Sequence, residues 1–147
     1  ILGQSVRVLA NEELIKMLSK IQSQSSSNIC SIAQKAALAA LTGSWDFVED
    51  MNVHFKRRRD LALSIIATWD GVQRFKPDGA FYLFVDVHEH YSDTCNDSGA
   101  FCEKMLEQAG VALVPGSAFG DDKCVRVSYA VDDATLEKAL HQIHENM

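Results

Sequence analysis

Apolar residues recur at helical spacing in three stretches of the first half of the chain. The first stretch, 11–21, opens with Asn11, whose side chain suits a helix N-cap. The polar run 22–28 interrupts this spacing and predicts a loop. Small and apolar residues over 32–41 predict a second helix with a narrow face, and we expect it to stop at Gly43.

The third stretch predicts one long helix from about Trp45 to Trp69. Its apolar members step by three, four or seven residues, and they are Val48, Met51, Phe55, Ala62, Ile66 and Trp69. This stripe would run for about 36 Å, which is more than a compact small domain needs. We therefore expect the helix to connect or brace two bodies. Arg59 falls on the same stripe, where it either extends its charge past the edge or pairs with an acid.

From Gly71 onward the pattern becomes that of strands separated by turns. Three runs rich in β-branched and aromatic residues predict strands, namely 79–87, 111–114 and 125–129. A helix capped by Asp97 is expected between the first two strands, and another is expected to begin near Asp132. The pattern predicts the α+β class, with a small three-stranded sheet, helices packed on one face of it and the long helix at its N-terminal side.

Composition and charge exclude several classes of function. The net charge of −6 argues against a general nucleic-acid partner, and no apolar run reaches the roughly 18 residues that suggest a membrane span. The opening residues are too few and too mixed for a signal peptide. The cysteines are Cys30, Cys95, Cys102 and Cys124, whose spacings fit no metal module. We interpret them as free thiols in a reducing cytoplasm.

Arg126 is the most informative charged side chain because it interrupts an apolar strand. Within 125–129 it shares one face with Ser128, and the valines and the tyrosine share the other. A guanidinium in this position needs an anionic partner. Two partners stay open at this point. One is a ligand carboxylate, which suits the planar fork, and the other is a structural ion pair with an acid such as Asp86.

Two other features suggest chemistry less specifically. The loop 114–120 is bounded by glycines and follows a strand, so it is either an anion-receiving loop or an ordinary turn. His88 and His90 would face the same way on an extended chain, as a metal-binding pair does, but the sequence offers no evident third ligand. No serine lies in the G-x-S-x-G context of a nucleophile.

Six short motifs, taken together in their order along the chain, resemble a known family. They are KIQSQSSSN at 20–28, IAQ at 32–34, RRRD at 57–60, PDGAFY at 77–82, VPGSAFG at 114–120 and VRVSYA at 125–130. In this order they resemble the C-terminal part, the small domain, of the class I pyridoxal-phosphate aminotransferases, and the bacterial-type aspartate aminotransferases above all. The resemblance covers about residue 10 to the end of the chain.

This resemblance implies an enzyme that uses pyridoxal phosphate to move an amino group between an amino acid and a 2-oxo acid. The amino acid expected from the resemblance is aspartate. The resemblance implies a homodimer. From the charge, the hydropathy and the free cysteines we expect a cytoplasmic protein with no nucleic-acid or membrane partner. In such enzymes the arginine matching Arg126 holds the substrate carboxylate, and Phe81 matches an aromatic residue beside the substrate. Ser27 and Asn28 match a loop near the cofactor phosphate of the neighbouring subunit. The loop 114–120 matches one that lines the site entrance.

The resemblance also divides the chain. Residues 1–10 do not match the family, 11–44 resemble helices of the large domain and the subunit interface, and 45–147 resemble the small domain with its long connecting helix. Ser19 and Lys20 lack the Thr-Gly-x-Arg run that follows the family's Schiff-base lysine.

We therefore expect a C-terminal fragment that is inactive on its own, with no catalytic residue of its own, no metal and no bound cofactor. An alternative of a different class is a stand-alone binding or assembly module. The small-residue face and the long helix favour it, because both suit packing against another body.

Overall fold

The chain forms two compact units, which meet in the sequence between Phe47 and Val48. A computed structural model describes residues 11–25 and 27–147. The segment 1–10, for which no family match was expected, lies outside the described residues. No helix within the described ranges is both long and apolar enough to cross a membrane.

The first unit contains helices α1 (Glu12–Ser25) and α2 (Ser31–Thr42). The predicted N-cap is confirmed, because the backbone N–H of Leu14 donates to Asn11 Oδ1 at 2.9 Å. The second helix stops at Gly43 as predicted. Neither helix contains a buried residue.

Helix α1 extends further into the polar run than the sequence predicted. The hydroxyl of Ser23 donates to the carbonyl of Lys20 at 2.8 Å, and that of Ser25 donates to the carbonyl of Ile21 at 3.0 Å. These side chains bond to the preceding turn of their own helix, so the helix accommodates them without a break. The predicted loop therefore begins only after Ser25.

Helix α3 (Asp46–Ile66) confirms the predicted long helix, although it ends three residues before Trp69. Ala62, Ile66 and Trp69 are buried in the core of the second unit. Of the two alternatives for Arg59, the ion pair forms, with Asp60 Oδ1 2.8 Å from its Nη2.

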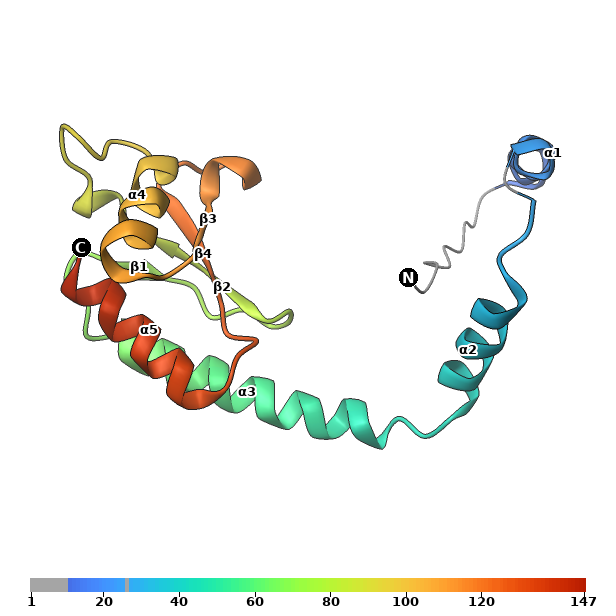
Figure 1. The fold of residues 1–147 in the computed structure, drawn as a ribbon, viewed down its shortest axis with the longest axis horizontal. Helices are drawn as coiled ribbons and strands as arrows, with labels where there is room; N and C mark the ends of the chain where they lie inside the picture. The colour runs from blue at the N-terminus through green and yellow to red at the C-terminus, as the bar shows by residue number, and fades with distance from the viewer. Residues whose placement is uncertain (1–10, 26) are drawn as a thin grey trace. The chain divides into compact units, whose positions relative to one another are not determined.

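The sheet of the second unit is antiparallel and has four strands in the order β1-β2-β4-β3 (Figure 1). They are β1 (Gln73–Arg74), β2 (Tyr82–Asp86), β3 (Val114–Pro115) and β4 (Cys124–Ser128). The prediction of a three-stranded sheet is wrong, because it missed the edge strand β1. Two exposed polar residues carry no alternating pattern, so nothing in the sequence indicated β1. The predicted strand over 111–114 is reduced to the short β3.

One face of this sheet packs against helices α3, α4 (Ser98–Lys104) and α5 (Asp133–Glu145). The buried strand residues on that face are Leu83, Val85, Val125 and Val127. They share a single core with Ala62 and Ile66 of α3, Phe101 of α4, and Leu136, Leu140 and Ile143 of α5. The prediction of an α+β fold with helices on one face is confirmed.

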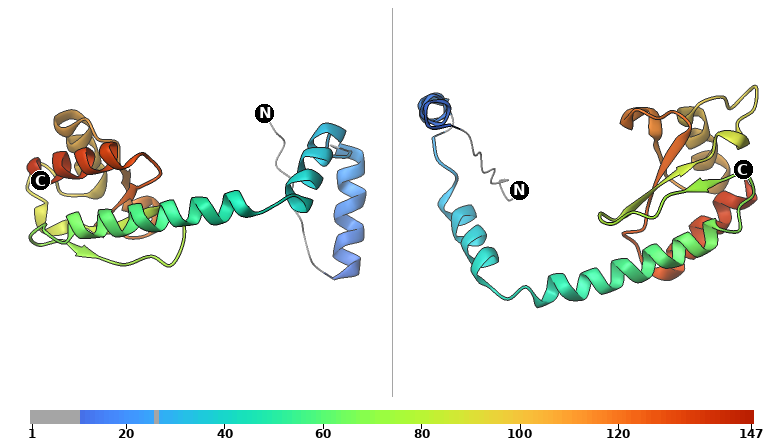
Figure 2. Two further views of the ribbon diagram at one scale, coloured as in Figure 1. Left: turned by 90° about the horizontal axis from the view of Figure 1, so that it is seen from below. Right: turned by 180° about the vertical axis from the view of Figure 1, so that it is seen from behind.

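Helices α3 and α5 lie side by side (Figure 2). Asp133 at the start of α5 holds two arginines of α3, with Arg57 Nη2 at 2.6 Å and Arg58 Nε at 3.2 Å. Helix α4 is followed by the π-helical turn η2 (Met105–Ala109), which ends at Gly110 with a left-handed φ of 66°. All four cysteines are free thiols, as predicted.

Candidate functional site

Arg126 lies in the middle of β4, which is an inner strand of the sheet. It is paired with Phe84 of β2 on one side and with Val114 of β3 on the other. Its neighbours Val125 and Val127 point into the core, so alternation directs the partly buried Arg126 to the opposite face of the sheet. That is the face that α3, α4 and α5 leave uncovered.

Aromatic rings hold the Arg126 guanidinium. Its central carbon lies 5.0 Å from the ring centroid of Tyr82 and 4.7 Å from that of Phe119. The Phe119 ring in turn lies edge-on to Phe84, with 6.2 Å between centroids. Cation–π contacts stabilise the charge of the guanidinium without using its N–H groups, which stay available for hydrogen bonds.

Within residues 11–25 and 27–147, no acid forms an ion pair with Arg126. Asp86, the internal partner considered from the sequence, is engaged elsewhere. Its Oδ1 lies 2.6 Å from His88 Nδ1 and accepts the His88 backbone N–H at 3.1 Å. The structural ion pair with Asp86 is therefore not formed, and Arg126 lies on the open face of the sheet without an acidic partner among the described residues.

Phe81 directly precedes β2, and its ring is 50% exposed. Ring centroids of Phe55 and Tyr82 lie 6.2 Å and 5.8 Å from it. Tyr82 therefore contacts both residues that the sequence singled out for substrate, Phe81 and Arg126. Sequence reasoning missed Tyr82 and Phe119, although Tyr82 and Phe84 have the alternation that places them on the Arg126 face.

The loop 114–120 contributes a side chain to the site rather than a nest of backbone donors. It folds into the short 3-10 turn η3 (Gly116–Phe119), which carries Phe119 at its end. The N–H groups of Ser117, Gly120 and Asp121 all donate within the chain. A side chain at Gly116 would collide with backbone carbonyl oxygens of neighbouring residues, so only glycine fits where the turn leaves β3.

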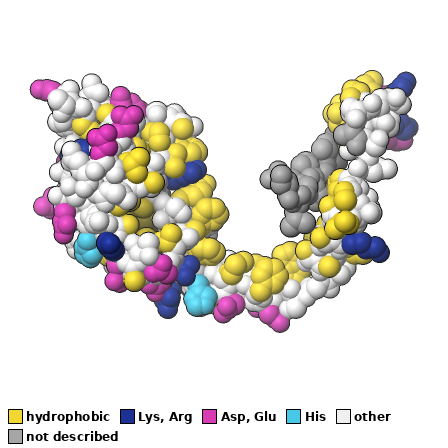
Figure 3. All heavy atoms as spheres, viewed as in Figure 1, with side chains coloured by type: hydrophobic (Ala, Val, Ile, Leu, Met, Phe, Trp, Pro, Cys, Tyr) yellow, Lys and Arg dark blue, Asp and Glu magenta, His cyan; other side chains and the backbone are white. Residues whose placement is uncertain are grey.

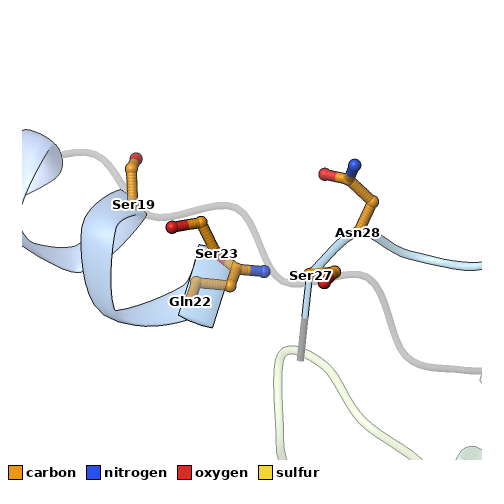
Figure 4. Close-up of a pocket in the computed structure, with 5 residues that line it drawn as sticks. All are labelled: Ser19, Gln22, Ser23, Ser27 and Asn28. Atoms are coloured by element: carbon orange, nitrogen blue, oxygen red, sulfur yellow. The ribbon is translucent and has the colours of Figure 1, made fainter. Parts of the chain in front are cut away.

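Ser27 and Asn28 line a cavity of about 320 Å³ together with Ser19, Gln22 and Ser23 (Figure 4). Ser27 has a left-handed φ of 56°, and its N–H donates to the carbonyl of Gln22 at 2.9 Å. The lining consists of hydroxyl and amide groups. These are suited to hydrogen bonds with phosphate oxygens, but no charged side chain in the lining neutralises a phosphate.

The lysines do not fit the covalent attachment of a pyridoxal cofactor. A lysine that forms an imine needs a neutral amine, which burial in an apolar pocket or a nearby cation produces. All eight lysines lie in the described residues, and none is buried. The side chain of Lys20 is exposed on α1. Lys16 Nζ lies 2.7 Å from Glu12 Oε1 in an exposed ion pair. The described residues therefore include a guanidinium suited to a carboxylate, and no lysine suited to the aldehyde of pyridoxal phosphate.

His88 and His90 have separate partners and do not converge. His88 contacts Asp86, whereas His90 Nε2 lies 2.8 Å from the carbonyl oxygen of Asp70. In the part of the chain that the structure describes, no three histidine, cysteine or acidic side chains lie close enough together to hold a metal ion. The geometry gives the idea of a histidine metal pair no support.

Comparison with known proteins gives a consistent result. A family model described as aminotransferase class I and II matches residues 7–143. A probable aspartate/prephenate aminotransferase of Rickettsia prowazekii is 43% identical over 139 residues, which cover 90% of this chain and 35% of that protein.

Solved structures agree. An aspartate aminotransferase from Rhizobium meliloti matches with a TM-score of 0.83 and 38% identity, over 91% of this chain and 35% of that one. The aspartate aminotransferase from Thermus thermophilus with maleate matches with a TM-score of 0.81 and 38% identity, over 92% of this chain and 35% of that one. The chain spans about a third of the length of these relatives.

Proposed function

The chain belongs to the class I and II aminotransferase family, as its six motifs predicted, and we propose that it forms the substrate-carboxylate-binding part of an aspartate aminotransferase. The whole enzyme would move an amino group between aspartate and a 2-oxo acid. For that enzyme the proposal includes pyridoxal phosphate as cofactor and a homodimer, which the family resemblance implies, and a cytoplasmic location, which the free cysteines favour.

The observation that carries the proposal is the unpaired guanidinium of Arg126 on the open face of the sheet. Two parallel N–H···O bonds to a carboxylate would satisfy donors that no acid of the described residues occupies. The rings of Tyr82 and Phe119 restrict its plane beforehand, so less conformational entropy is lost when the carboxylate binds. The Thermus thermophilus relative was solved with maleate, a dicarboxylate, which supports this assignment.

Binding a carboxylate positions a substrate but does not by itself transfer an amino group. When bound, pyridoxal phosphate supplies the electron sink for chemistry at the amino-acid Cα. The lysines of this chain do not fit its attachment, so the residues described here bind and orient the substrate only. We therefore propose that the chain alone is inactive.

A binding titration with maleate tests the Arg126 assignment. We expect wild type to bind, and Arg126→Ala to lose about tenfold or more in affinity because charge-assisted hydrogen bonds are removed. Arg74→Ala is the matched control, since it removes the same charge from the exposed edge strand β1. Equal affinities for Arg126→Ala and wild type would refute the assignment. The uncharged dimethyl ester of maleate should not bind to any of the three.

An assay with aspartate, 2-oxoglutarate and added pyridoxal phosphate tests the inactivity of the chain. We expect no turnover beyond that of the free cofactor. Turnover that disappears in a Lys16→Ala, Lys20→Ala double variant would show that one of these exposed lysines does form the imine. Turnover that survives in that variant would assign the imine to another lysine.

The assembly module is the second candidate, and the exposed apolar side chains of α1 and α2 favour it. Ile21 of α1 is 67% exposed and Ile32 of α2 is 75% exposed. Apolar surface of this kind promotes association. Light scattering tests this candidate, because exposed apolar faces should drive association, and a clean monomer at high protein concentration would argue against it. A maleate titration of the same sample then shows whether the associated protein also binds a carboxylate.

A further inference from the structure

Ser98 is a buried polar residue that the proposed function does not use. Its side chain at the start of α4 has no exposed surface, although the rest of the core is apolar. Its hydroxyl donates to Asp122 Oδ1 at 2.6 Å, and its backbone N–H donates to the same oxygen at 3.1 Å. A buried hydroxyl retained at the cost of desolvation needs a structural or functional reason.

The same hydroxyl also holds the turn η3. The backbone N–H of Ser117 donates to Ser98 Oγ at 3.2 Å, and the two hydroxyl oxygens of these serines lie 3.2 Å apart. One buried oxygen therefore links α4, the segment containing Asp122 and the turn that carries Phe119.

Asp122 is itself anchored, so this network is fixed at both ends. The Tyr91 hydroxyl donates to the Asp122 backbone carbonyl at 2.7 Å. Hydrogen bonds from Ser98 lower the pKa of the Asp122 carboxyl, which keeps it ionised and a strong acceptor. At the other end, the close approach of Gly116 to backbone carbonyls keeps the start of the turn against β4.

Phe119 transmits the position of the turn to Arg126. Its ring is the closer of the two aromatic contacts of the guanidinium, 4.7 Å from the central carbon. Because no acid of the described residues orients Arg126, the position of this ring, together with that of Tyr82, sets the plane of the guanidinium. A bidentate hydrogen bond to a carboxylate is sensitive to that plane.

We propose that Ser98 is a positioning residue for the carboxylate-binding Arg126, acting through the Ser117 N–H and the Phe119 ring. This inference rests on the proposed function of Arg126. It assigns to a buried serine, which is not itself in contact with Arg126, control over how well the guanidinium presents its donors.

Maleate affinity of Ser98→Ala measures this control. We expect a loss of about threefold to tenfold, in the range of couplings measured for residues that do not touch the ligand. In a Phe119→Ala background the same substitution should change the affinity by less than about twofold, because the transmitting ring is gone. An unchanged affinity in Ser98→Ala, or an equal loss in both backgrounds, would overturn the proposal.

Two controls separate positioning from general loss of stability. Ile143→Val removes a methyl group from the core at α5, so it should lower the melting temperature and leave the affinity unchanged. If Ser98→Ala does not fold, Asp122→Ala replaces it in the test. This variant removes the exposed carboxylate that accepts the hydrogen bonds of Ser98, and it should also lower the maleate affinity. Asp122→Asn keeps an acceptor oxygen for Ser98 and should restore most of the affinity.

The ligand-free protein offers a readout that does not depend on maleate binding. The Nε–H resonance of Arg126 in ¹H–¹⁵N spectra reports its aromatic surroundings, and it should shift in Ser98→Ala while that of Arg74 stays in place. A wild type that does not bind maleate would refute the proposed function, yet this shift would still support positioning. An unmoved Arg126 resonance would refute positioning, whether or not maleate binds.

Discussion

The two units of the chain use the same kind of helix in opposite ways. In the first unit, the apolar side chains of α1 and α2 lie at the surface (Figure 3), and neither helix has a buried residue. In the second unit, isoleucines on the apolar stripes of the helices are buried, namely Ile66 of α3 and Ile143 of α5. The amphipathic pattern is similar in both units, and only the second contains a surface for it to cover.

This difference teaches where the stability of the chain resides. Isolated helices shorter than about 12–15 residues are marginal in water, and α1 and α2 have 14 and 12 residues. Their helicity depends on packing against something else. The core of the second unit joins two strands to three helices, which is sufficient for cooperative folding of that unit.

Hydrogen exchange gives the largest expected contrast between the units. Amides of β4 and α5 should exchange only on global unfolding, whereas those of α1 and α2 should exchange through local opening. The protection factors should differ by about a thousandfold or more, given a typical domain stability. Comparable protection in α1 and α5 would contradict the comparison.

One substitution made in each unit sharpens the contrast. Leu140→Ala in α5 leaves a cavity in the core and should cost about 2–5 kcal/mol of unfolding free energy. Leu38→Ala in α2 removes the same atoms from an exposed position and should change that energy by less than about 0.5 kcal/mol. Denaturant titrations of both variants measure these energies. A similar cost for the two would show that α2 packs into the same cooperative unit.

The sequence predicted the regular parts of the fold because their patterns are local. The long helix α3, the caps Asn11 and Asp97, and the start of a helix near Asp132 all appear in the structure. The edge strand β1 and the π-helical turn η2 could not be predicted, since they follow from the path of the chain over a finished sheet and core. For the same reason, the pattern of α1 did not show whether its stripe would be buried.

The site was predictable only in part. Alternation in β4 placed Arg126 opposite the core, and the same alternation in β2 could have placed Tyr82 on that face, although the sequence analysis did not use it. The sequence could not exclude Asp86 as the partner of Arg126, because that depended on tertiary contacts. In the structure, the Asp86 carboxylate contacts His88 instead. The contribution of Phe119 depends on the turn η3, whose direction no periodicity encodes.

The reactivity of the cysteine thiols should also differ between the two units, by less than the hydrogen exchange rates do. Cys30 is exposed at the start of α2, where the nearby N–H groups of Ala33 and Ile32 lower the pKa of its thiol. Burial raises the pKa of Cys102 in α4 to about 11. A disulfide reagent at pH 8 should therefore modify Cys30 at least about tenfold faster than Cys102. Equal rates would mean that the core opens readily.

The raised pKa of Cys102 also sets a pH dependence for the second unit. An unfolded thiol loses its proton near about pH 8.5, whereas the buried thiol keeps it to about 11. Above pH 8.5 the unfolded state therefore binds fewer protons than the native state, and stability should fall as the pH rises toward 11. Cys102→Ser, followed by thermal melting at pH 8 and pH 10, should reduce this fall.

Ion pairs give the smallest contrast. Asp133→Ala releases both Arg57 and Arg58 and should cost about 0.5–1 kcal/mol, because these pairs are partly shielded from solvent. Glu12→Ala breaks a pair with Lys16 that is largely exposed on α1, and it should change the unfolding free energy by less than about 0.3 kcal/mol. Added salt should reduce the first effect in thermal melts.

The central claim is that the N–H donors of the Arg126 guanidinium have no acidic partner within the described part of the chain and are available to bind a ligand carboxylate. The most direct test follows its side-chain Nε–H resonance in the wild-type chain while maleate is added, with Arg74 as the internal reference. The account predicts a saturable shift of the Arg126 resonance and a stationary Arg74 resonance. An Arg126 resonance that stays in place, or that moves no more than that of Arg74, would contradict it.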